Sequence, residues 1–219
     1  MSPATARPRA EDAAGGVIAG NIYDKYGTRN PIERRLVAGF DRAMFELLER
    51  VRPVGSVLEV GCGEGHVTAK LARCFPGARV LGADVSPEVV AIARRLHPGL
   101  EFEVRSIYDP PAAGERFDLV VACEVLEHLE DPERALRSVS GAARRHLFVS
   151  VPREPVWRLM NLARGRYWSA LGNTPGHVQH WSREGLLRML ARHVEVVAVS
   201  SPLPWTQALC RVVAAEAGR

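Results

Sequence analysis

Residues 57–72 read VLEVGCGEGHVTAKLA, in which a short apolar run breaks into three glycines and then continues with a helical pattern. Single residues separate Gly61, Gly63 and Gly65. Glycine allows backbone conformations that are closed to other residues, and it lets a ligand approach the main chain closely. The stretch therefore predicts a buried strand, a tight turn beside a ligand, and a helix.

Strand-like and helical segments alternate around this turn. The β-branched runs expected to form strands are residues 56–61, 78–84, 100–104, 117–123 and 146–151. Helical spacing of apolar residues, with polar caps and first-turn prolines, predicts helices at 31–51, 65–75, 89–96, 132–143 and 182–193. This alternation indicates an α/β fold with a doubly wound, mostly parallel sheet covered by helices on both faces.

The chain after Pro152 follows another pattern. Residues 153–181 carry three of the four tryptophans and their own Gly and Pro residues, without a strand signal. They predict an inserted cover segment on the substrate side of the sheet. Two strand-like runs at 194–200 and 208–215, joined by a Pro-containing turn, predict a final hairpin and an antiparallel edge.

The remaining expectations come from composition. With 219 residues, 47% of them apolar, the chain is expected to form one domain at 21–219, after a disordered tail at 1–20 rich in Ala, Pro, Arg and Gly. It has no apolar run long enough to span a membrane and no signal-peptide block, so a cytoplasmic protein is expected, either a monomer or a homodimer.

Charge and cysteine spacing exclude other classes. The four cysteines lie far apart, which argues against a zinc ribbon and against a disulfide framework. The net charge of +4 comes from arginines scattered along the chain, so nucleic acid is not the expected partner.

The glycine turn limits the choice of ligand. A nicotinamide fingerprint needs a third glycine where this chain has His66, and no Gly-Lys-Ser/Thr ending is present for a phosphate loop. Glu59 precedes the turn, and a carboxylate there suits a ligand with an ammonium group better than a diphosphate. Asp84 ends the second predicted strand, where a carboxylate can accept hydrogen bonds from both hydroxyls of a ribose.

Three motifs in order, "LEVGCGEG", "LGADVSPE" and "FDLVVACEVLEHLEDPERAL", resemble those of class I S-adenosylmethionine-dependent methyltransferases over residues 57–152. The resemblance implies a Rossmann-like sheet of seven strands with an antiparallel last strand. It also implies S-adenosylmethionine as the cofactor.

The resemblance assigns roles to individual residues. It implies that Gly61, Cys62 and Gly63 pass the methionine and ribose moieties, that Asp84 holds the ribose diol, and that Val85 lies on the adenine. Many relatives have an Asp after the third strand, where this chain has Ser106, so adenine recognition is left to Ser106, Ile107 or Asp109. Glu124 is expected to contact the methionine moiety.

A second cluster follows the fourth predicted strand. If "CEVLEHLEDP" is helical, Glu124, Glu127 and His128 share one face and could bind a divalent cation such as Mg²⁺ or Zn²⁺. The motif also resembles the metal site of ubiquinone-type O-methyltransferases and of small-RNA 2′-O-methyltransferases, in which a downstream histidine completes the site; His177 and His180 are candidates. The alternative is a metal-free site with His128 as a base or as pocket lining.

The function expected from these features is methyl transfer to the hydroxyl of a small molecule, for example in secondary metabolism. His128 and His180 are the candidate catalytic residues, because a hydroxyl acceptor must lose a proton. The alternatives are a metal-dependent RNA 2′-O-methyltransferase and a non-catalytic, cofactor-binding partner protein. Aromatic residues of the cover could line the acceptor or pack the cover onto the sheet; these are Trp157, Tyr167, Trp168 and Trp181. Tyr23 and Tyr26 resemble a lid segment of relatives.

Overall fold

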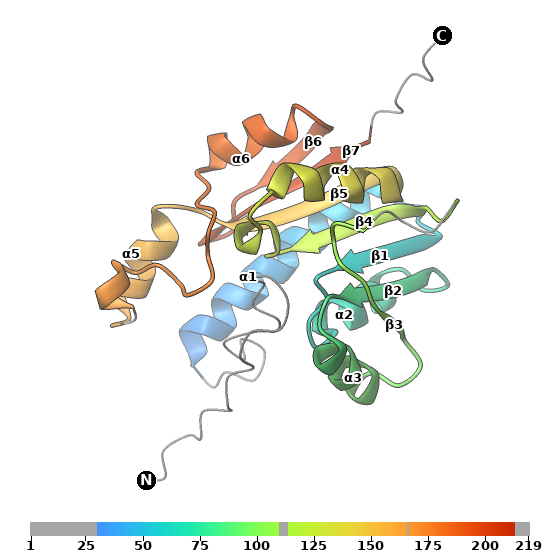
Figure 1. Cartoon of the computed structure of the whole chain (residues 1–219), viewed down its shortest axis with the longest axis horizontal. Coiled ribbons are helices and arrows are strands. Elements are labelled where there is room, and N and C mark those ends of the chain that lie inside the picture. Colours follow the sequence, from blue (N-terminus) through green and yellow to red (C-terminus); the bar gives the residue numbers. More distant parts are fainter. Residues whose placement is uncertain (1–29, 110–113, 166, 213–219) are drawn as a thin grey trace.

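The computed structural model describes residues 30–109, 114–165 and 167–212. The predicted tail at 1–20 and the predicted lid residues Tyr23 and Tyr26 lie outside the described residues. Figure 1 shows one sheet with helices on both faces, as the alternating sequence pattern predicts.

The sheet has seven strands in the order β3-β2-β1-β4-β5-β7-β6. The first five strands of the chain run parallel, while β7 pairs antiparallel with both β5 and β6. Both the mostly parallel sheet and the antiparallel last strand are therefore confirmed. The strands are β1 (Ser56–Val60), β2 (Arg79–Asp84), β3 (Glu101–Val104), β4 (Phe117–Cys123), β5 (Ala143–Pro152), β6 (Glu195–Ser200) and β7 (Trp205–Arg211).

The helices begin where the sequence places their caps. The side chains of Asn30, Ser86, Asp131 and Ser182 each accept a hydrogen bond from a first-turn N–H group, which has no partner inside its helix. The α-helices are α1 (Pro31–Leu48), α2 (His66–Cys74), α3 (Pro87–Leu96), α4 (Pro132–Ala142), α5 (Val156–Ala163) and α6 (Arg183–Leu190). Three short 3₁₀ turns are η1 (Glu49–Val51), η2 (Leu126–His128) and η3 (Trp168–Ala170).

Alternate residues of the central strands supply two separate cores. In β4, Leu119 and Val121 pack with α1 and α2 on one face, while Val120 and Ala122 pack with α4 and α6 on the other. Successive side chains of a strand point to opposite faces, so a central strand between two helical layers must be apolar at every position. This explains why the strand runs of this sequence are continuous rather than alternating.

The strand order reverses between β1 and β4. The strand after β1 lies on one side of this neighbouring pair, and the strand after β4 lies on the other side. In such sheets a crevice forms beyond the carboxyl ends of the strands at the reversal. The arrows of β1, β2 and β4 point to the same edge in Figure 1, and α5 and the start of α1 lie beyond that edge. The ends of the cover segment lie side by side, since Glu154 N donates to Trp181 O at 2.8 Å.

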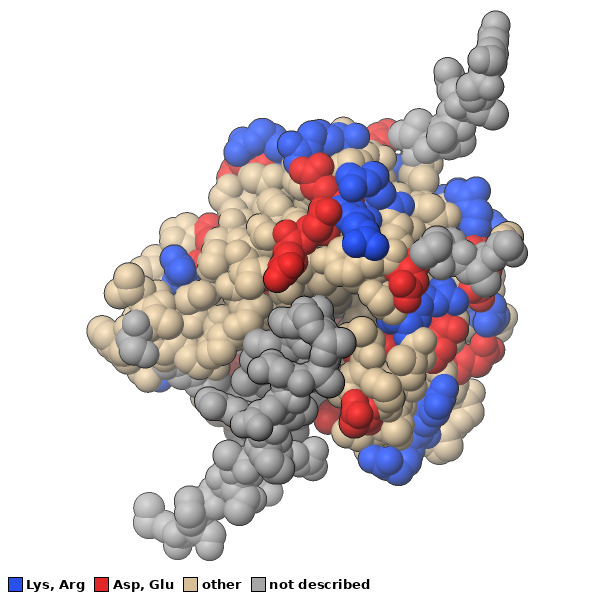
Figure 2. Space-filling model, viewed as in Figure 1, with Lys and Arg blue, Asp and Glu red and all other residues tan. Residues whose placement is uncertain are grey.

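Charges of both signs are interleaved on the surface. Figure 2 shows basic and acidic side chains next to each other over α4 and α6, where Arg192 pairs with Glu133, whereas the cover on the left is mostly uncharged. Among the described residues, no helix has the length and apolar character needed to cross a membrane.

Candidate functional site

The glycine turn after β1 requires its glycines. Gly61, Gly63 and Gly65 have φ values of +68°, +54° and +81°, which side chains of L-residues rarely allow. A Cβ added to Gly61 would lie 2.4 Å from Cγ2 of Val125, on the loop after β4. The backbone of the turn therefore packs against the loop that follows β4, and the turn leads directly into α2.

Asp84 ties this turn to the end of β2. Its Oδ2 accepts a hydrogen bond from Gly63 N at 2.9 Å, and its Oδ1 accepts one from Ser86 N at 3.1 Å. The side chain is only 7% exposed. Two backbone N–H groups stabilise the charged carboxylate at this buried position. The acidic group predicted for ribose binding is thus held rigidly against the glycine turn.

Glu59 and Cys62 provide the buried side chains on either side of Gly61. Glu59 is 2% exposed and accepts a hydrogen bond from the Thr68 hydroxyl of α2. Burial raises the pKa of the Cys62 thiol, and the nearby carboxylates of Glu59 and Asp84 raise it further. Cys62 is therefore a neutral, unreactive lining group rather than a thiolate nucleophile.

A pocket opens at this edge of the sheet and brings together the glycine turn, the end of β4 and one face of α1. Its lining residues are Phe40, Glu59, Gly61, Cys62, Gly63, Glu64, His66, Val67, Cys123, Glu124 and His128. Residues from three separate stretches of sequence therefore meet around one cavity. The side chains are mainly acidic, imidazole or apolar, a lining suited to a cationic ligand.

The stretch after β4 is not the α-helix considered from the sequence. Only the single 3₁₀ turn η2 forms, and Glu124 before it has a φ of +55°. Glu124 therefore does not share a helical face with Glu127 and His128, and that expectation was wrong. The chain must turn sharply here, because Glu124 N pairs with Ser150 O while Leu126 is fully buried in the core.

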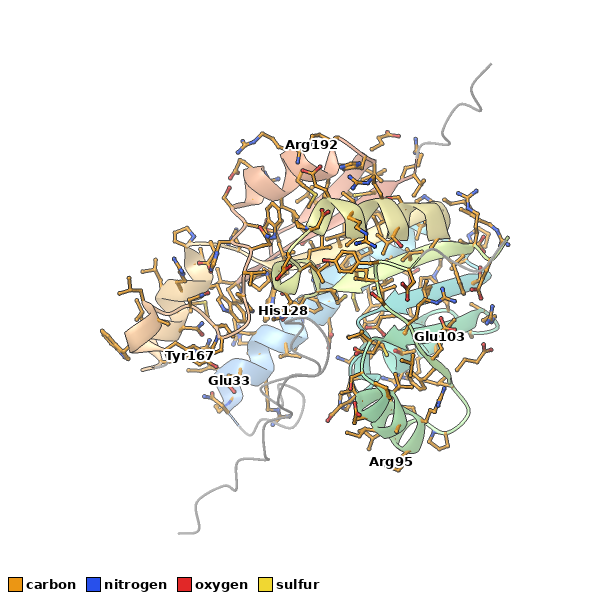
Figure 3. The ribbon with its side chains drawn as sticks, in the orientation of Figure 1. Glu33, Arg95, Glu103, His128, Tyr167 and Arg192 are labelled. Atoms are coloured by element: carbon orange, nitrogen blue, oxygen red, sulfur yellow. The ribbon has the colours of Figure 1, made fainter. Side chains whose placement is uncertain are left out.

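His128 lies at the end of this turn, near the centre of Figure 3, while Arg95 and Arg192 lie on the outside of the molecule. Its Nδ1 is 2.9 Å from the carbonyl oxygen of Gly176. A carbonyl oxygen can only accept a hydrogen bond, so Nδ1 carries the proton, and in the neutral ring Nε2 carries the lone pair. This is the tautomer that can accept a proton, or bind a cation, at Nε2.

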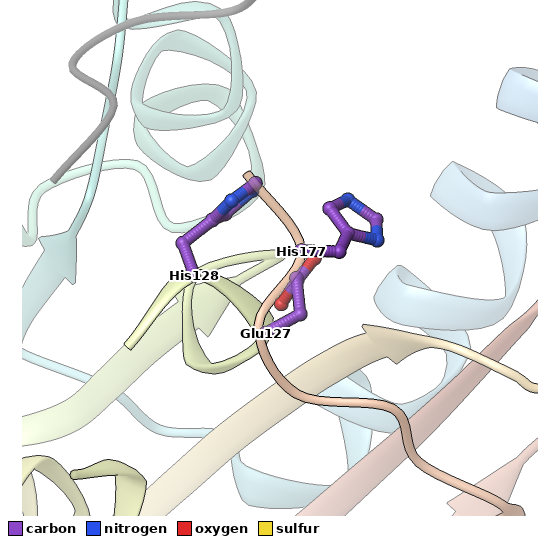
Figure 4. Close-up of side chains that lie close together, drawn as sticks. All are labelled: Glu127, His128 and His177. Atoms are coloured by element: carbon purple, nitrogen blue, oxygen red, sulfur yellow. The ribbon is translucent and has the colours of Figure 1, made fainter. Parts of the chain in front are cut away.

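Glu127, His128 and His177 form a group whose ligand atoms all lie within 4.8 Å of one another. Figure 4 shows Glu127 and His128 on the turn after β4 and His177 on the cover chain that passes over it. The Glu127 side chain is 1% exposed and that of His177 is 8% exposed. The metal set predicted from sequence was Glu124, Glu127 and His128, whereas the structure gathers His177 instead of Glu124.

His180 does not line the pocket and is not in this group. Its ring is exposed, and Nε2 lies 2.9 Å from Oδ1 of Asn173. Its catalytic role stays a prediction.

The other predicted residues lie around the same edge. Val85 follows Asp84 and is 42% exposed, as an adenine contact would have to be. Ser106 accepts a hydrogen bond from Tyr108 N, and Ser106 N donates to the Asp109 carboxylate, so these polar groups close a local turn after β3. Ile107 packs against the core formed with α4 and α6. The adenine contacts stay predictions.

The aromatic residues of the cover behave differently from one another. Trp157 stacks on the His177 ring at 6.0 Å between centroids, and its indole N–H donates to the Thr174 hydroxyl. Trp168 is 66% exposed. Trp157 also lies 5.9 Å from the ring of Trp205 in β7, so it packs the cover onto the sheet, as the second interpretation from the sequence had it. Trp168 faces solvent.

Several lining residues had no role in the sequence interpretation. Phe40 comes from α1, far away in the sequence, and only its place on an apolar helical face was visible. Glu64 and His66 flank Gly65 within the turn itself. Their position directly beside the glycines could have marked them as lining residues.

Comparison with known proteins agrees with this geometry. Residues 33–193 match a family model described as a methyltransferase domain, so the chain belongs to that family. The resemblance to class I S-adenosylmethionine-dependent methyltransferases is thereby confirmed.

Two relatives are methyltransferases whose names contain a quinone. The chain is 34% identical over 145 residues to a ubiquinone biosynthesis O-methyltransferase of Methylobacterium sp. (strain 4-46), covering 64% of this chain and 57% of the relative. It is 32% identical over 111 residues to a demethylmenaquinone methyltransferase of Chlorobaculum parvum, covering 48% of this chain and 46% of the relative. The chain thus spans less than two thirds of these relatives.

Solved structures share the fold at low identity. Magnesium protoporphyrin IX methyltransferase from Synechocystis PCC 6803, solved with bound SAH, has a TM-score of 0.64 at 19% identity, covering 85% of this chain and 90% of that one. The plantazolicin methyltransferase, also solved with SAH, has a TM-score of 0.66 at 13% identity, covering 84% and 86%.

Proposed function

We propose that this protein is an S-adenosylmethionine-dependent methyltransferase that methylates a hydroxyl group of a small molecule. The observation that carries the proposal is the buried Asp84 carboxylate, bonded to Gly63 N at the carboxyl edge where the sheet order reverses. Each oxygen already accepts one backbone hydrogen bond and keeps a further lone pair for a ribose hydroxyl.

The pocket charges support a cationic cofactor. The lining includes Glu59, Glu64 and Glu124, and the positive φ of the three glycines lets a ligand lie directly on the backbone. S-adenosylmethionine carries an ammonium and a sulfonium, and both are attracted by carboxylates in a poorly solvated pocket. We assign the amino-acid end of the cofactor to Glu59 and Glu124, and the ribose to Asp84.

His128 supplies the proton acceptor in this proposal. The sulfonium is already a good leaving group, so the protein has to align the acceptor oxygen with the methyl carbon and remove the hydroxyl proton. With Nδ1 donating to Gly176, Nε2 of His128 accepts that proton at the rim of the pocket. The quinone-related relatives support a ring hydroxyl as the acceptor.

Calorimetric titration with S-adenosylmethionine and with its demethylated product tests the cofactor assignment. Asp84→Asn should weaken binding by about 100-fold, because a charged acceptor of two hydroxyls becomes a neutral one. Asp118→Asn is the matched control. Asp118 also accepts two backbone N–H groups, from Gly55 and Ser56, but at the opposite edge of the sheet. Equal affinities of the two variants would refute the assignment.

The group of Glu127, His128 and His177 favours a metal-dependent version of the same reaction. Two imidazoles and one carboxylate form the donor set of many catalytic zinc sites, and three protein ligands leave one position for a substrate oxygen. Such an ion would lower the pKa of a bound hydroxyl and hold it toward the methyl group.

Metal titration separates the two versions. Zn²⁺ or Mn²⁺ should bind the wild type in an equilibrium measurement, whereas Glu127→Gln and His177→Phe should lose the affinity. Glu130→Gln, an exposed carboxylate on the same loop, is the control. If metal-free protein transfers the methyl group at the same rate as metal-loaded protein, the metal version is wrong and His128 acts as the base.

A further inference from the structure

We propose that the cover turn Thr174–His177 is a positioning device for His128, holding its ring in the tautomer with the proton on Nδ1. The role of that tautomer in proton transfer rests on the proposed function, whereas the tautomer itself can be measured without any substrate.

The turn itself has a defined geometry. His177 N donates to Thr174 O at 3.1 Å, with Pro175 and Gly176 between them. Gly176 has a φ of +86°. Proline at the second position and glycine with positive φ at the third are the requirements of a type II turn. This conformation fixes the direction of the Gly176 carbonyl, whose oxygen lies 2.9 Å from Nδ1 of His128.

The chain after the turn is bonded to the loop that carries His128. The N–H groups of Val178 and Gln179 both donate to the carbonyl of Glu127, at 2.9 and 3.0 Å. The Gln179 side chain donates to Leu129 O at 3.1 Å. The cover turn and the turn after β4 therefore move as one unit, and the bond between Gly176 and His128 is held in register.

The chain before the turn is anchored to α5. The Thr174 hydroxyl accepts from Trp157 Nε1 at 2.9 Å and from Asn161 Nδ2 at 3.2 Å. Asn161 is 2% exposed and also donates to Gly172 O at 2.9 Å. Buried amide and indole groups need their acceptors, so this network allows the turn few other positions.

The network continues to the first helix of the domain. Nη2 of Arg164 donates to Oδ1 of Asn161 at 2.7 Å, and Nη1 of Arg164 lies 3.6 Å from the buried Glu33 carboxylate of α1. A chain of polar contacts thus runs from α1 through the cover to the His128 ring. Thr174 and Gly176 are positioning residues in this scheme, since neither supplies a side chain that touches the proposed reaction centre.

Long-range ¹H–¹⁵N spectra of the imidazole groups measure the tautomer directly. In the wild type with a neutral His128 ring, Nδ1 should be protonated and Nε2 unprotonated. Gly176→Ala strains the turn and should raise the fraction of the Nε2–H form roughly 2- to 10-fold, the range expected for the loss of one neutral hydrogen bond. Gly165→Ala is the control, because Gly165 has a φ of +71° in the same cover with nothing near its Cβ position.

A pair of substitutions at Thr174 tests the anchor, and it keeps the proposal falsifiable if Gly176→Ala does not fold. Thr174→Val removes the acceptor with little change in shape and should shift the tautomer in the same direction, whereas Thr174→Ser should behave as the wild type. An Nε2–H form in the wild type, or an unchanged spectrum in folded Thr174→Val, would overturn the proposal. Cofactor affinity, measured in parallel, should be unchanged in Thr174→Val, so failure here is distinct from failure of the proposed function.

Discussion

The two edges of the sheet each have a carboxylate that accepts two backbone hydrogen bonds, and the pocket lined by the glycine turn lies at the carboxyl edge. Asp84 at the carboxyl edge bonds Gly63 N and Ser86 N, and Asp118 at the amino edge bonds Gly55 N and Ser56 N. Asp84 is held beside a turn with three positive-φ glycines, whereas Asp118 sits beside Gly55, for which no left-handed φ is required. Asp118 also lies 3.8 Å from the guanidinium of Arg144.

A buried or half-buried carboxylate that accepts two backbone hydrogen bonds is therefore not by itself a sign of a binding site. At the amino edge the carboxylate joins the starts of β1 and β4, and an arginine lies close to its charge. At the carboxyl edge the carboxylate is bonded to Gly63 of the glycine turn, which lines the pocket. Substitutions at matching positions of the two edges should therefore differ in their effects.

The largest difference is expected for two histidines. His128→Gln should lower kcat by roughly 10²–10⁴-fold if Nε2 is the general base, with little change in cofactor affinity. His146→Gln, toward the amino end of β5, should leave kcat within about twofold, since it lies away from the pocket lining. Steady-state kinetics with a methyl-labelled cofactor measures both. Near-wild-type turnover of His128→Gln would leave this ring as pocket lining only.

A smaller difference is expected for two glycines. Gly61→Ala places a Cβ 2.4 Å from Val125 and forces an alanine to a φ of +68°, so it should lower the free energy of unfolding by about 2–4 kcal/mol. Gly55→Ala brings a Cβ only to 3.2 Å from the Asp118 carboxylate and should cost less than about 1 kcal/mol. Urea unfolding of both variants gives the comparison. Equal losses of unfolding free energy in the two variants would mean that neither the positive φ of Gly61 nor its contact with Val125 constrains the turn.

The smallest difference concerns two thiols in alkaline solution. Burial raises the pKa of Cys62 in the folded protein, so its thiol stays protonated while the unfolded chain ionises. The resulting stability is present below about pH 9 and is lost as the pH rises further, by at most about 1.4 kcal/mol per pH unit. Cys62→Ala should flatten this decline more than Cys74→Ala, whose thiol is only partly buried. Identical pH dependence of the unfolding free energy in these two variants would contradict the prediction.

Local sequence patterns were enough to predict the fold, the starts of four helices and the glycine turn after β1. Caps at Asn30, Ser86, Asp131 and Ser182 all hold as predicted, because a capping side chain reaches only two or three residues along the chain. The spacing from Gly63 to Asp84 likewise follows from one helix, α2, and one strand, β2. The pocket position of Phe40 could not be predicted, since it depends on how α1 packs against the sheet.

The sequence by itself determined which elements follow one another along the chain. Apolar runs marked the buried strands, glycines marked the turn, and a carboxylate marked the end of β2. Only the tertiary structure decided which residues surround His128, where the methyl acceptor is proposed to bind. The turn after β4 took a 3₁₀ form that separates Glu124 from Glu127, and the cover brought His177 and the Gly176 carbonyl to His128 from some fifty residues away. Period and spacing encode neighbours within one element, whereas contacts between a loop and a distant segment depend on packing, which no local pattern expresses.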